Sequence, residues 1–320
     1  MGLIRPEHVV RGIGDDCAVI ELDDVNCLLI TTDLLVERVH FQRSWSTAHI
    51  LGRKALAVNV SDIAACGGIP RDAFVSIAVP GHIELEWLES FYQGMTSLAG
   101  EFDINVLGGD TTRSRSDLVI NVALTGVVPR DEVLLRNTAQ PGDIIVLTGP
   151  TGQSAAGCEI LLHQHQIPDS LADPLTKAHL DPRPHVKEGR FLATCHCCSA
   201  AIDVSDGLSS DLGHICSQSG TGALLCEDKI PLTEALSSAC RHMGRDPLDL
   251  ALHGGEDYVL IATIKEASLS RLEDEAKHQG IDLFPIGILQ EKPGIEIVRR
   301  SGITEAVPPR GWNHFTKTSE

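Results

Sequence analysis

The first 130 residues alternate between segments rich in β-branched and aliphatic residues and segments with helical spacing of apolar residues. The apolar residues of 47–66 and 84–100 recur at the period of an amphipathic helix. Strand-like segments, each bounded by turn-forming residues, are expected at 27–33, 73–80, 104–109 and 118–128. A chain with this alternation folds as a sheet covered by helices. The pattern therefore limits the fold to a mixed α/β class.

A second set of elements follows residues 130–142, where charges, prolines and a Pro-Gly turn indicate a domain boundary. Strands are expected at 144–148, 199–203, 222–226, 257–264 and 283–289, and helices at 153–165, 206–219, 232–242 and 268–279. We predict an α/β (mixed α+β) protein of two domains. The N-terminal domain, a mixed sheet with helices, covers 1–132, and a C-terminal α/β domain covers 133–320.

The charge balance excludes several classes of partner. The chain has 26 Lys and Arg against 44 Asp and Glu, for a net charge of −18. Nucleic acids and anionic membrane surfaces attract basic proteins, so neither is an expected partner. No apolar run is long enough to cross a bilayer, and the N-terminus lacks the apolar segment of a signal peptide. With ten cysteines expected to be reduced thiols, we predict a cytoplasmic protein.

The cysteine-rich segment Cys195-His196-Cys197-Cys198 is the densest group of metal-type ligands in the sequence. Structural zinc sites usually pair two such knuckles that are separated in sequence, and no second knuckle is visible. We expect no structural metal at this segment.

Aspartates beside small residues recur where predicted strands or helices end. They are Asp15, Asp16, Asp33, Asp62, Asp110, Asp203 and Asp206. Any one of them alone is most simply a surface or capping residue, and Ser205 is a plausible helix N-cap. As a set, they form the kind of oxygen-rich site that holds Mg²⁺ together with substrate phosphates, and Thr31 and Thr32 offer further oxygens. Metal ions would also offset the repulsion between ATP and a chain of charge −18.

Two glycine-rich segments bear on phosphate binding. Gly108 and Gly109 are expected to end a strand in a tight turn that presents Asp110 and two threonines. The segment 149–157 follows a strand and opens a helix, as phosphate-binding loops do, but it lacks lysine. It is either a plain tight turn or a phosphate contact. The P-loop, dinucleotide-binding and protein-kinase motifs are missing from the sequence.

In their order along residues 12–315, these segments resemble the thiamine-monophosphate kinase family. The matching segments are GIGDDCAVI, TTDLLVERVHF, KALAVNVSDIAACGGIP, LGGDTT, PGDIIVLTG, DVSDGLSSDLGHI, GGEDYVL and GWNHF. The resemblance implies a two-domain fold of the aminoimidazole ribonucleotide synthetase type that dimerises through its N-terminal domain. It also implies ATP-dependent phosphorylation of thiamine monophosphate to thiamine diphosphate, the last step of thiamine diphosphate biosynthesis, assisted by several Mg²⁺ ions, in a homodimer.

The resemblance also assigns roles to individual residues. The magnesium ligands fall on Asp16, Thr31, Thr32, Asp33, Asp62, Asp110, Asp203 and Asp206. The ATP contacts fall on Gly109, Asp110, Arg136 and Ser205, and the substrate contacts on His40, Glu256 and Trp312. Read without the family, His40 is a core histidine, Glu256 an acceptor of backbone N–H groups and Trp312 a packing anchor.

Arg38 stands where the family usually has glycine. If its segment is extended, its side chain lies on the same face as that of His40 and near the acceptor's phosphate; alternatively it crowds a turn.

Two other functions stay open at this stage. The chain could be another ATP-using superfamily member, of the selenophosphate or aminoimidazole ribonucleotide synthetase type. It could also be a catalytically inactive nucleotide-binding scaffold, although all seven aspartates are present.

Overall fold

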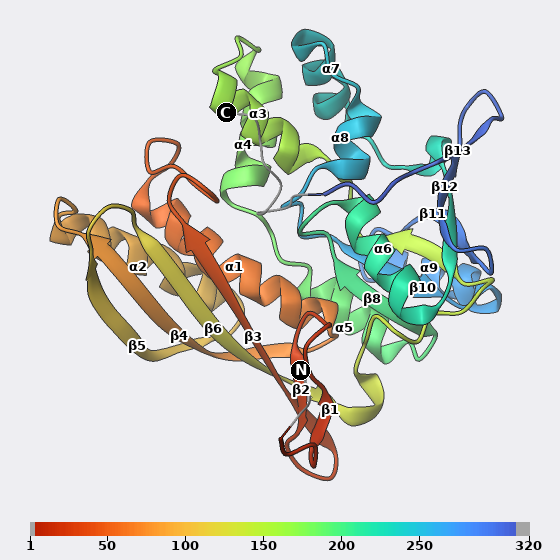
Figure 1. Ribbon diagram of the computed structural model, residues 1–320, viewed down its shortest axis with the longest axis horizontal. Coiled ribbons are helices and arrows are strands. Elements are labelled where there is room, and N and C mark those ends of the chain that lie inside the picture. The colour runs from red at the N-terminus through yellow and green to blue at the C-terminus, as the bar shows by residue number, and fades with distance from the viewer. Residues whose placement is uncertain (1–3, 312–320) are drawn as a thin grey trace. The chain divides into compact units, whose positions relative to one another are not determined.

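The computed structural model describes residues 4–311 and divides into two compact units. The first unit comprises Met1–Leu134 and Leu180–His196, and the second comprises Leu135–His179 and Cys197–Glu320. Figure 1 shows one mixed sheet with helices in each unit, so the predicted α/β (mixed α+β) class is confirmed. The domain division predicted at 132/133 lies two residues before the end of the first segment at Leu134, and residues 180–196 also belong to the first unit.

The sheet of the first unit has six strands in the order β1-β2-β3-β6-β4-β5. The strands are β1 (Val9–Arg11), β2 (Ala18–Glu21), β3 (Asn26–Val36), β4 (Ile69–Pro80), β5 (Asn105–Ser114) and β6 (Val119–Pro129). All neighbours are antiparallel except β4 and β5. The long β3 pairs with β6 over its whole length. A 3₁₀ turn, η1 (Arg130–Glu132), follows β6.

Two helices cover one face of this sheet, α1 (Ala48–Ala65) and α2 (Leu85–Glu101) (Figure 1). The hydroxyl of Thr47 caps α1 by accepting from the backbone N–H of Ile50 at 3.3 Å. In α2, Phe91, Met95 and Leu98 form the buried face that the sequence predicts. The helices meet at glycines, because a Cβ on Gly52 would lie 1.9 Å from the Phe91 carbonyl oxygen, and one on Gly94 would lie 1.8 Å from that of His49.

Helix α5 (Val186–Thr194) explains why residues 180–196 belong to the first unit. It packs against α1, with Phe191 and Leu192 buried. Arg190 pairs with Glu132 at 2.5 Å, and the segment before the helix pairs Asp181 with Arg53 of α1 at 2.8 Å. This segment follows the predicted boundary in sequence but packs in the first unit.

Strand β5 corrects the prediction that Gly108 and Gly109 end a strand in a tight turn. The chain stays extended through Ser114 and pairs with β4 in parallel, with a bulge between Val106 and Gly108. Gly109 is required there because a Cβ would lie 1.7 Å from the Val75 carbonyl oxygen. Asp110 thus sits within an edge strand instead of a loop, and its side chain is exposed.

The sheet of the second unit has seven strands in the order β13-β12-β9-β11-β7-β10-β8. They are β7 (Ile144–Leu147), β8 (Cys198–Asp203), β9 (Gly222–Cys226), β10 (Leu260–Ile264), β11 (Phe284–Gln290), β12 (Gly294–Val298) and β13 (Thr304–Ala306). Only β9 and β12 are parallel neighbours. The helices are α3 (Gln153–His163), α4 (Asp169–Leu180), α6 (Leu208–Ser219), α7 (Glu234–Met243), α8 (Pro247–His253) and α9 (Leu269–His278), with 3₁₀ turns η2 (Glu227–Lys229) and η3 (Glu266–Ser268).

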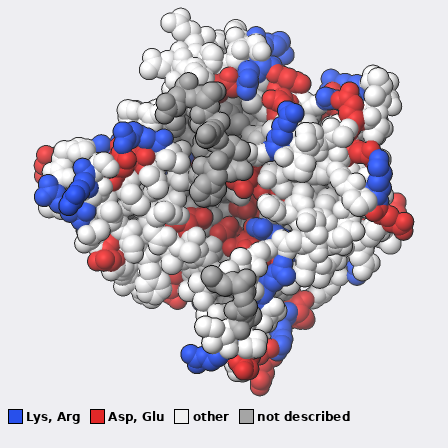
Figure 2. All heavy atoms as spheres, in the orientation of Figure 1, with Lys and Arg blue, Asp and Glu red and all other residues white. Residues whose placement is uncertain are grey.

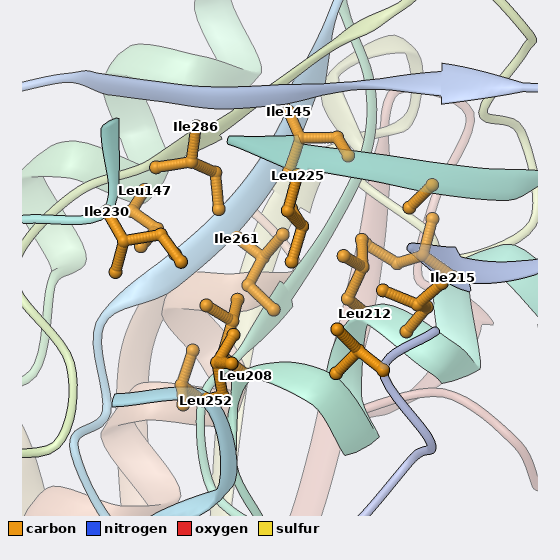
Figure 3. Packing of buried hydrophobic residues seen from close by; sticks show 14 of the residues in the cluster. Ile145, Leu147, Leu208, Leu212, Ile215, Leu225, Ile230, Leu252, Ile261 and Ile286 are labelled. Atoms are coloured by element: carbon orange, nitrogen blue, oxygen red, sulfur yellow. The ribbon is translucent and has the colours of Figure 1, made fainter. Parts of the chain in front are cut away.

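The core of the second unit lies between its sheet and its helices (Figure 3). Ile145 and Leu147 of β7, Ile261 of β10 and Leu212 of α6 are all fully buried within one cluster. Burial of this apolar surface fixes α6 on the sheet and thereby fixes the loop that joins β8 to α6.

The surface drawn in Figure 2 carries both signs of charge. Lys and Arg side chains lie there in separate groups with Asp and Glu among them, so this face presents no continuous basic surface. Within residues 4–311, no helix has the length and apolar character needed to span a bilayer.

The glycine contact between α1 and α2 generates a stability prediction. Gly94→Ala should lower the free energy of unfolding by about 3 kcal/mol or more, because the added methyl group meets backbone that cannot move independently. Denaturant unfolding followed by circular dichroism measures this change.

Gly100→Ala is the matched control, since it lies in the same helix with open space around its Cα. It should leave stability unchanged or raise it by up to about 1 kcal/mol, through the higher helix propensity of alanine. Equal effects of the two substitutions would contradict the close contact.

Candidate active site

Three of the predicted ligands in the first unit lie on β3, and a fourth lies on α1. Thr31 is buried, Thr32 is exposed and Asp33 is partly buried, as the alternation of side chains along a strand requires. The Thr31 hydroxyl donates a short hydrogen bond to the Asp62 carboxylate on α1. The backbone N–H of Asp33 donates to the side-chain oxygen of Asn59, one helical turn before Asp62, at 3.1 Å.

Asp16, in the loop before β2, joins this group. One of its carboxylate oxygens lies within 4.8 Å of an oxygen of Asp62. Burial, followed by the charge of Asp16, raises the pKa of Asp33 to about 6. The first unit therefore brings Asp16 near both Asp62 and Asp33.

This arrangement fits a hard divalent cation. Its donors are carboxylate and hydroxyl oxygens, which Mg²⁺ prefers. Carboxylates held close to one another repel, and a bound cation would offset that repulsion. Asp16, Thr31, Asp33 and Asp62 are the residues of the first unit that would hold it.

The second unit gathers another acidic group at the end of β8. Asp203 is buried, and an oxygen of Asp206 lies within 4.8 Å of ligand atoms of Asp211 and His214. Burial, followed by the charges of Asp203 and Asp206, raises the pKa of Asp211.

Asp211 is a residue that the sequence analysis did not single out. Its carboxylate accepts from the backbone N–H groups of Asp206 and Gly207, at 3.1 and 3.0 Å. Asp211 therefore shapes the loop that presents Asp206. Its position in the first turn of the helix that follows Ser-Asp-Gly is the signal that could have revealed it.

Ser205 and Arg136, both predicted to contact ATP, lie in this unit. Ser205 is not the N-cap of α6, which is Gly207, so the capping alternative for Ser205 is wrong. The carbonyl of Ser205 instead accepts from the backbone N–H of Glu256 at 2.7 Å. Burial, followed by the charge of Arg136, lowers the pKa of His214, which indicates that Arg136 lies close to the Asp206 group.

The loop 149–157 already holds an anion, and that anion belongs to the protein. The Asp257 carboxylate accepts from the backbone N–H of Gly152 at 2.5 Å and from that of Ser154 at 3.0 Å. Burial raises the pKa of Asp257 to about 7, although these hydrogen bonds oppose the rise. The N-terminus of α3 is thus occupied by a carboxylate in the place that a phosphate would take, which favours the structural alternative for this loop.

Glu256 is held by a buried histidine. The Nδ1 atom of His179, on α4, lies 3.1 Å from the Glu256 carboxylate and 3.0 Å from the Ser154 hydroxyl. Glu256 and Tyr258 both have left-handed backbone conformations, with φ of 64° and 53°. Non-glycine residues held in this conformation often mark functional sites. The segment around Glu256 is therefore a strained and fixed part of the second unit.

His40 closes the turn that follows β3. Its Nδ1 accepts from the backbone N–H of Val36 at 3.0 Å, so its other ring nitrogen, Nε2, carries the proton of the neutral ring. Trp312, the remaining predicted substrate contact, lies outside the described residues.

Arg38 differs from the expectation for an extended segment. Its φ is 68°, so the chain turns there and the argument that Arg38 and His40 share one face of a strand is wrong. Its guanidinium is largely exposed and pairs with Asp117 at 2.7 Å. A glycine would adopt this backbone conformation without strain.

Arg38→Gly should therefore raise the free energy of unfolding relative to Arg38→Ala by about 1 kcal/mol, because only the glycine removes the left-handed strain. Both substitutions remove the exposed ion pair with Asp117, so its small contribution cancels in the comparison. Urea unfolding of the two variants provides the measurement. Equal stabilities would mean that residue 38 is not strained.

Known proteins with similar sequences and structures agree with the fold. The family described as "AIR synthase related protein, N-terminal domain" matches residues 14–128, and its C-terminal counterpart matches residues 140–300. The chain is 39% identical over 310 residues to the thiamine-monophosphate kinase of Escherichia coli K12, covering 96% of this chain and 92% of that protein. The Bacillus subtilis thiamine-monophosphate kinase is 34% identical, with 98% and 95% covered.

A solved structure described as "AaThiL complexed with AMPPCP and TMP" superposes with a TM-score of 0.84 at 34% identity, covering 95% of this chain and 92% of that one. Thiamine monophosphate kinase from Aquifex aeolicus superposes with a TM-score of 0.80 at 31% identity, covering 91% and 92%. The two family models match successive parts of the chain, and the two relatives, which match nearly its whole length, are both thiamine-monophosphate kinases. The chain belongs to the thiamine-monophosphate kinase family.

Proposed function

We propose that this protein transfers the γ-phosphoryl group of ATP to the phosphate of thiamine monophosphate, and that the products are thiamine diphosphate and ADP. The relatives named above carry this activity in their names, and the related structure holds an ATP analogue together with the ligand abbreviated TMP. The observation in this chain that supports the proposal best is the oxygen-only group of Asp16, Asp62 and Thr31. Such a group suits a reaction between two anions.

The reaction needs positioning and charge neutralisation more than acid–base chemistry. An oxygen of the acceptor phosphate, already anionic at neutral pH, forms a bond to the γ-phosphorus as the bond to the β,γ-bridging oxygen breaks. The electron pair leaves with ADP, and no proton has to be removed from the acceptor. Mg²⁺, when bound, would neutralise charge on the phosphates. The task of the protein's side chains is to hold both anions in line.

The metal ligands are part of this proposal. In the first unit they are Asp16, Thr31, Thr32, Asp33, Asp62 and Asp110, and in the second they are Asp203 and Asp206. Their number suits more than one ion, since Mg²⁺ commonly takes only one or two carboxylates. The first group is supported by the raised pKa of Asp33, which burial and then the charge of Asp16 cause. The burial of Asp203 at the end of β8 supports the second.

The ATP contacts are proposed for Gly109, Asp110, Arg136 and Ser205. Gly109 lies on β5, which is an edge strand of its sheet, and it packs closely against Val75 of β4. Arg136 offers a guanidinium fork that can bind phosphate, in the unit that also carries Asp206.

The substrate contacts are proposed for His40, Glu256 and Trp312. The ring of His40 is fixed at the turn after β3, because its Nδ1 accepts from the backbone N–H of Val36. Glu256 is fixed by His179 and by its backbone bond to Ser205, as a binding carboxylate would need to be. An aromatic side chain such as that of Trp312 would suit the cationic thiazolium ring of the substrate.

A homodimer that forms through the N-terminal domain also belongs to the proposal. Strand β5 lies at the edge of its sheet with most of its residues exposed, among them Leu107, whose side chain is 60% accessible. Exposed edge strands favour pairing with another chain. A cytoplasmic location is likewise proposed, and it is supported by the thiol state of all ten cysteines.

The alternatives kept open by the sequence are less well supported. Family membership argues against the selenophosphate and aminoimidazole ribonucleotide synthetase types, which act on other acceptors. An inactive scaffold would not need to keep a strained Glu256 or a repulsive carboxylate group.

ADP release should depend on thiamine monophosphate and on Mg²⁺, and free thiamine should not replace the monophosphate. The reason is that the thiamine hydroxyl must lose a proton, whereas the phosphate oxygen is already anionic. A coupled assay with thiamine monophosphate, thiamine and no acceptor measures this directly. Comparable rates with thiamine would contradict the mechanism, and ATP binding without turnover would favour the inactive scaffold.

Asp62→Asn should lower turnover by about 10²–10³-fold, the size of effect expected when one charge-stabilising group is lost from an active site. The metal-free variant should be at least as stable as the parent, because one carboxylate of a repelling group has been removed. Steady-state kinetics and thermal unfolding in the presence of a chelator measure the two effects.

Asp24→Asn is the matched control, since Asp24 is an exposed aspartate of the same unit without a proposed role. Asp24→Asn should change neither the turnover nor the thermal stability. A loss of stability with normal specific activity in Asp62→Asn would make Asp62 a structural residue.

A further inference from the structure

Two buried cysteines meet beside the acidic group of the first unit, and the proposed kinase chemistry uses neither. Cys17 precedes β2, and Cys66 is the C-cap residue of α1. Both are buried, with 1% and 0% of their surfaces exposed. The Cys17 thiol donates to the Cys66 sulfur, and the backbone N–H of Cys17 points to the same sulfur. N–H donors of this kind stabilise metal-bound sulfur.

Two carboxylates face the Cys66 sulfur. Ligand atoms of Asp15, Asp16 and Cys66 all lie within 4.8 Å of one another. The Asp15 side chain is completely buried, and its oxygens accept from Arg11 Nε at 3.2 Å and from the backbone N–H of Asp16 at 3.3 Å. The carboxylate is thus held in place beside the sulfur before any ligand arrives.

The spacing and the donor types suit a cation that binds sulfur. In a tetrahedral zinc site, with bonds of about 2.0–2.3 Å, neighbouring ligand atoms are about 3.5 Å apart. The ligand atoms of Asp15, Asp16 and Cys66 all lie within 4.8 Å of one another, which is near this spacing. Mg²⁺ has little affinity for sulfur, whereas Zn²⁺ and Cd²⁺ accept mixed sulfur and oxygen ligands.

We propose that Cys66, Asp15 and Asp16, with Cys17 as the fourth ligand, bind one sulfur-seeking divalent cation of the Zn²⁺ or Cd²⁺ class. Each thiol that binds the ion releases its proton to water. The site shares Asp16 with the proposed Mg²⁺ group, so the two kinds of ion compete for that carboxylate. The proposal rests on geometry within the first unit and does not require the kinase activity.

The test uses the full chain freed of metal and without added Mg²⁺, because Mg²⁺ would compete for Asp16. Cd²⁺ is added while the ultraviolet absorption of the cadmium–thiolate bond is followed, and equilibrium dialysis gives the affinity. We expect a thiolate band that saturates at one ion per chain. Cys66→Ser should abolish most of the band and weaken binding at least about tenfold, since even an outer-shell partner contributes that much.

Two matched controls separate this site from other thiols. Cys27→Ser alters a buried cysteine of β3 in the same unit, and Cys197→Ser alters the cysteine-rich segment around His196. Both should bind Cd²⁺ as the parent does. Asp15→Asn keeps both sulfurs, so it should retain the band while binding more weakly.

The outcomes decide the proposal even if one variant is unstable. Circular dichroism of the metal-free proteins shows which variants are folded, and Asp15→Asn replaces Cys66→Ser if the latter is not. Parent protein without a thiolate band, an unchanged band and affinity in folded Cys66→Ser, unchanged affinity in Asp15→Asn, or loss of the band in either control would each overturn the proposal. Loss of kinase activity in any variant has no bearing on this result.

Discussion

Helix α1 carries the acidic site of the first unit, and it can do so because it is buried on almost every side. Fourteen of its 18 residues are buried, including Lys54 and Asn59. A helix that is enclosed in this way cannot rotate or fray without disturbing the sheet and the neighbouring helix. Asp62 therefore has a fixed position relative to Thr31 on β3. Glycines at the contact, Gly52 and Gly94, allow α1 and α2 to pack this closely.

The carboxylates of the acidic group in the first unit repel one another, so their electrostatic interaction opposes folding. Buried carboxylates that lie near one another disfavour the folded chain, and the pKa of Asp33 is raised first by burial and then by the charge of Asp16. The packing of α1 against β3 holds these carboxylates in place despite their repulsion. The second unit solves a similar problem differently, since backbone N–H groups from residues 206 and 207 satisfy Asp211. In both units the charged groups lie on or next to regular elements instead of long loops.

Much of this organisation could be predicted from local sequence pattern. Helices α1 and α2 and strands β3, β6, β7 and β9 lie where apolar periodicity indicates them, because each buries one face or two. The short strands β1, β2, β12 and β13 were not predicted. They have only three to five residues and depend on neighbouring strands for their hydrogen bonds.

The contacts that define the site's fine structure are long-range, and sequence pattern does not contain them. His179 and Glu256 are far apart in the chain, and so are Asp257 and the loop at Gly152. The aspartates could be predicted as a metal-binding set because they are carboxylates beside small residues at the ends of predicted elements. Arg38 shows the limit of that approach, because the spacing of two residues from His40 implies a shared face only in an extended segment, whereas Arg38 has a left-handed conformation.

The bulge in β5 has a consequence for which changes in chain length this protein can accept. Side chains alternate along a strand, so Asp110 and Thr112 lie on one face of the sheet while Thr111 and Arg113 lie on the other. The extra residue between Val106 and Gly108 sets which pair lies on which face. A one-residue deletion in β5 that kept the bulge would exchange the two faces for every later residue, even though each kept its identity. The length of this short segment is therefore under a stricter constraint than its composition.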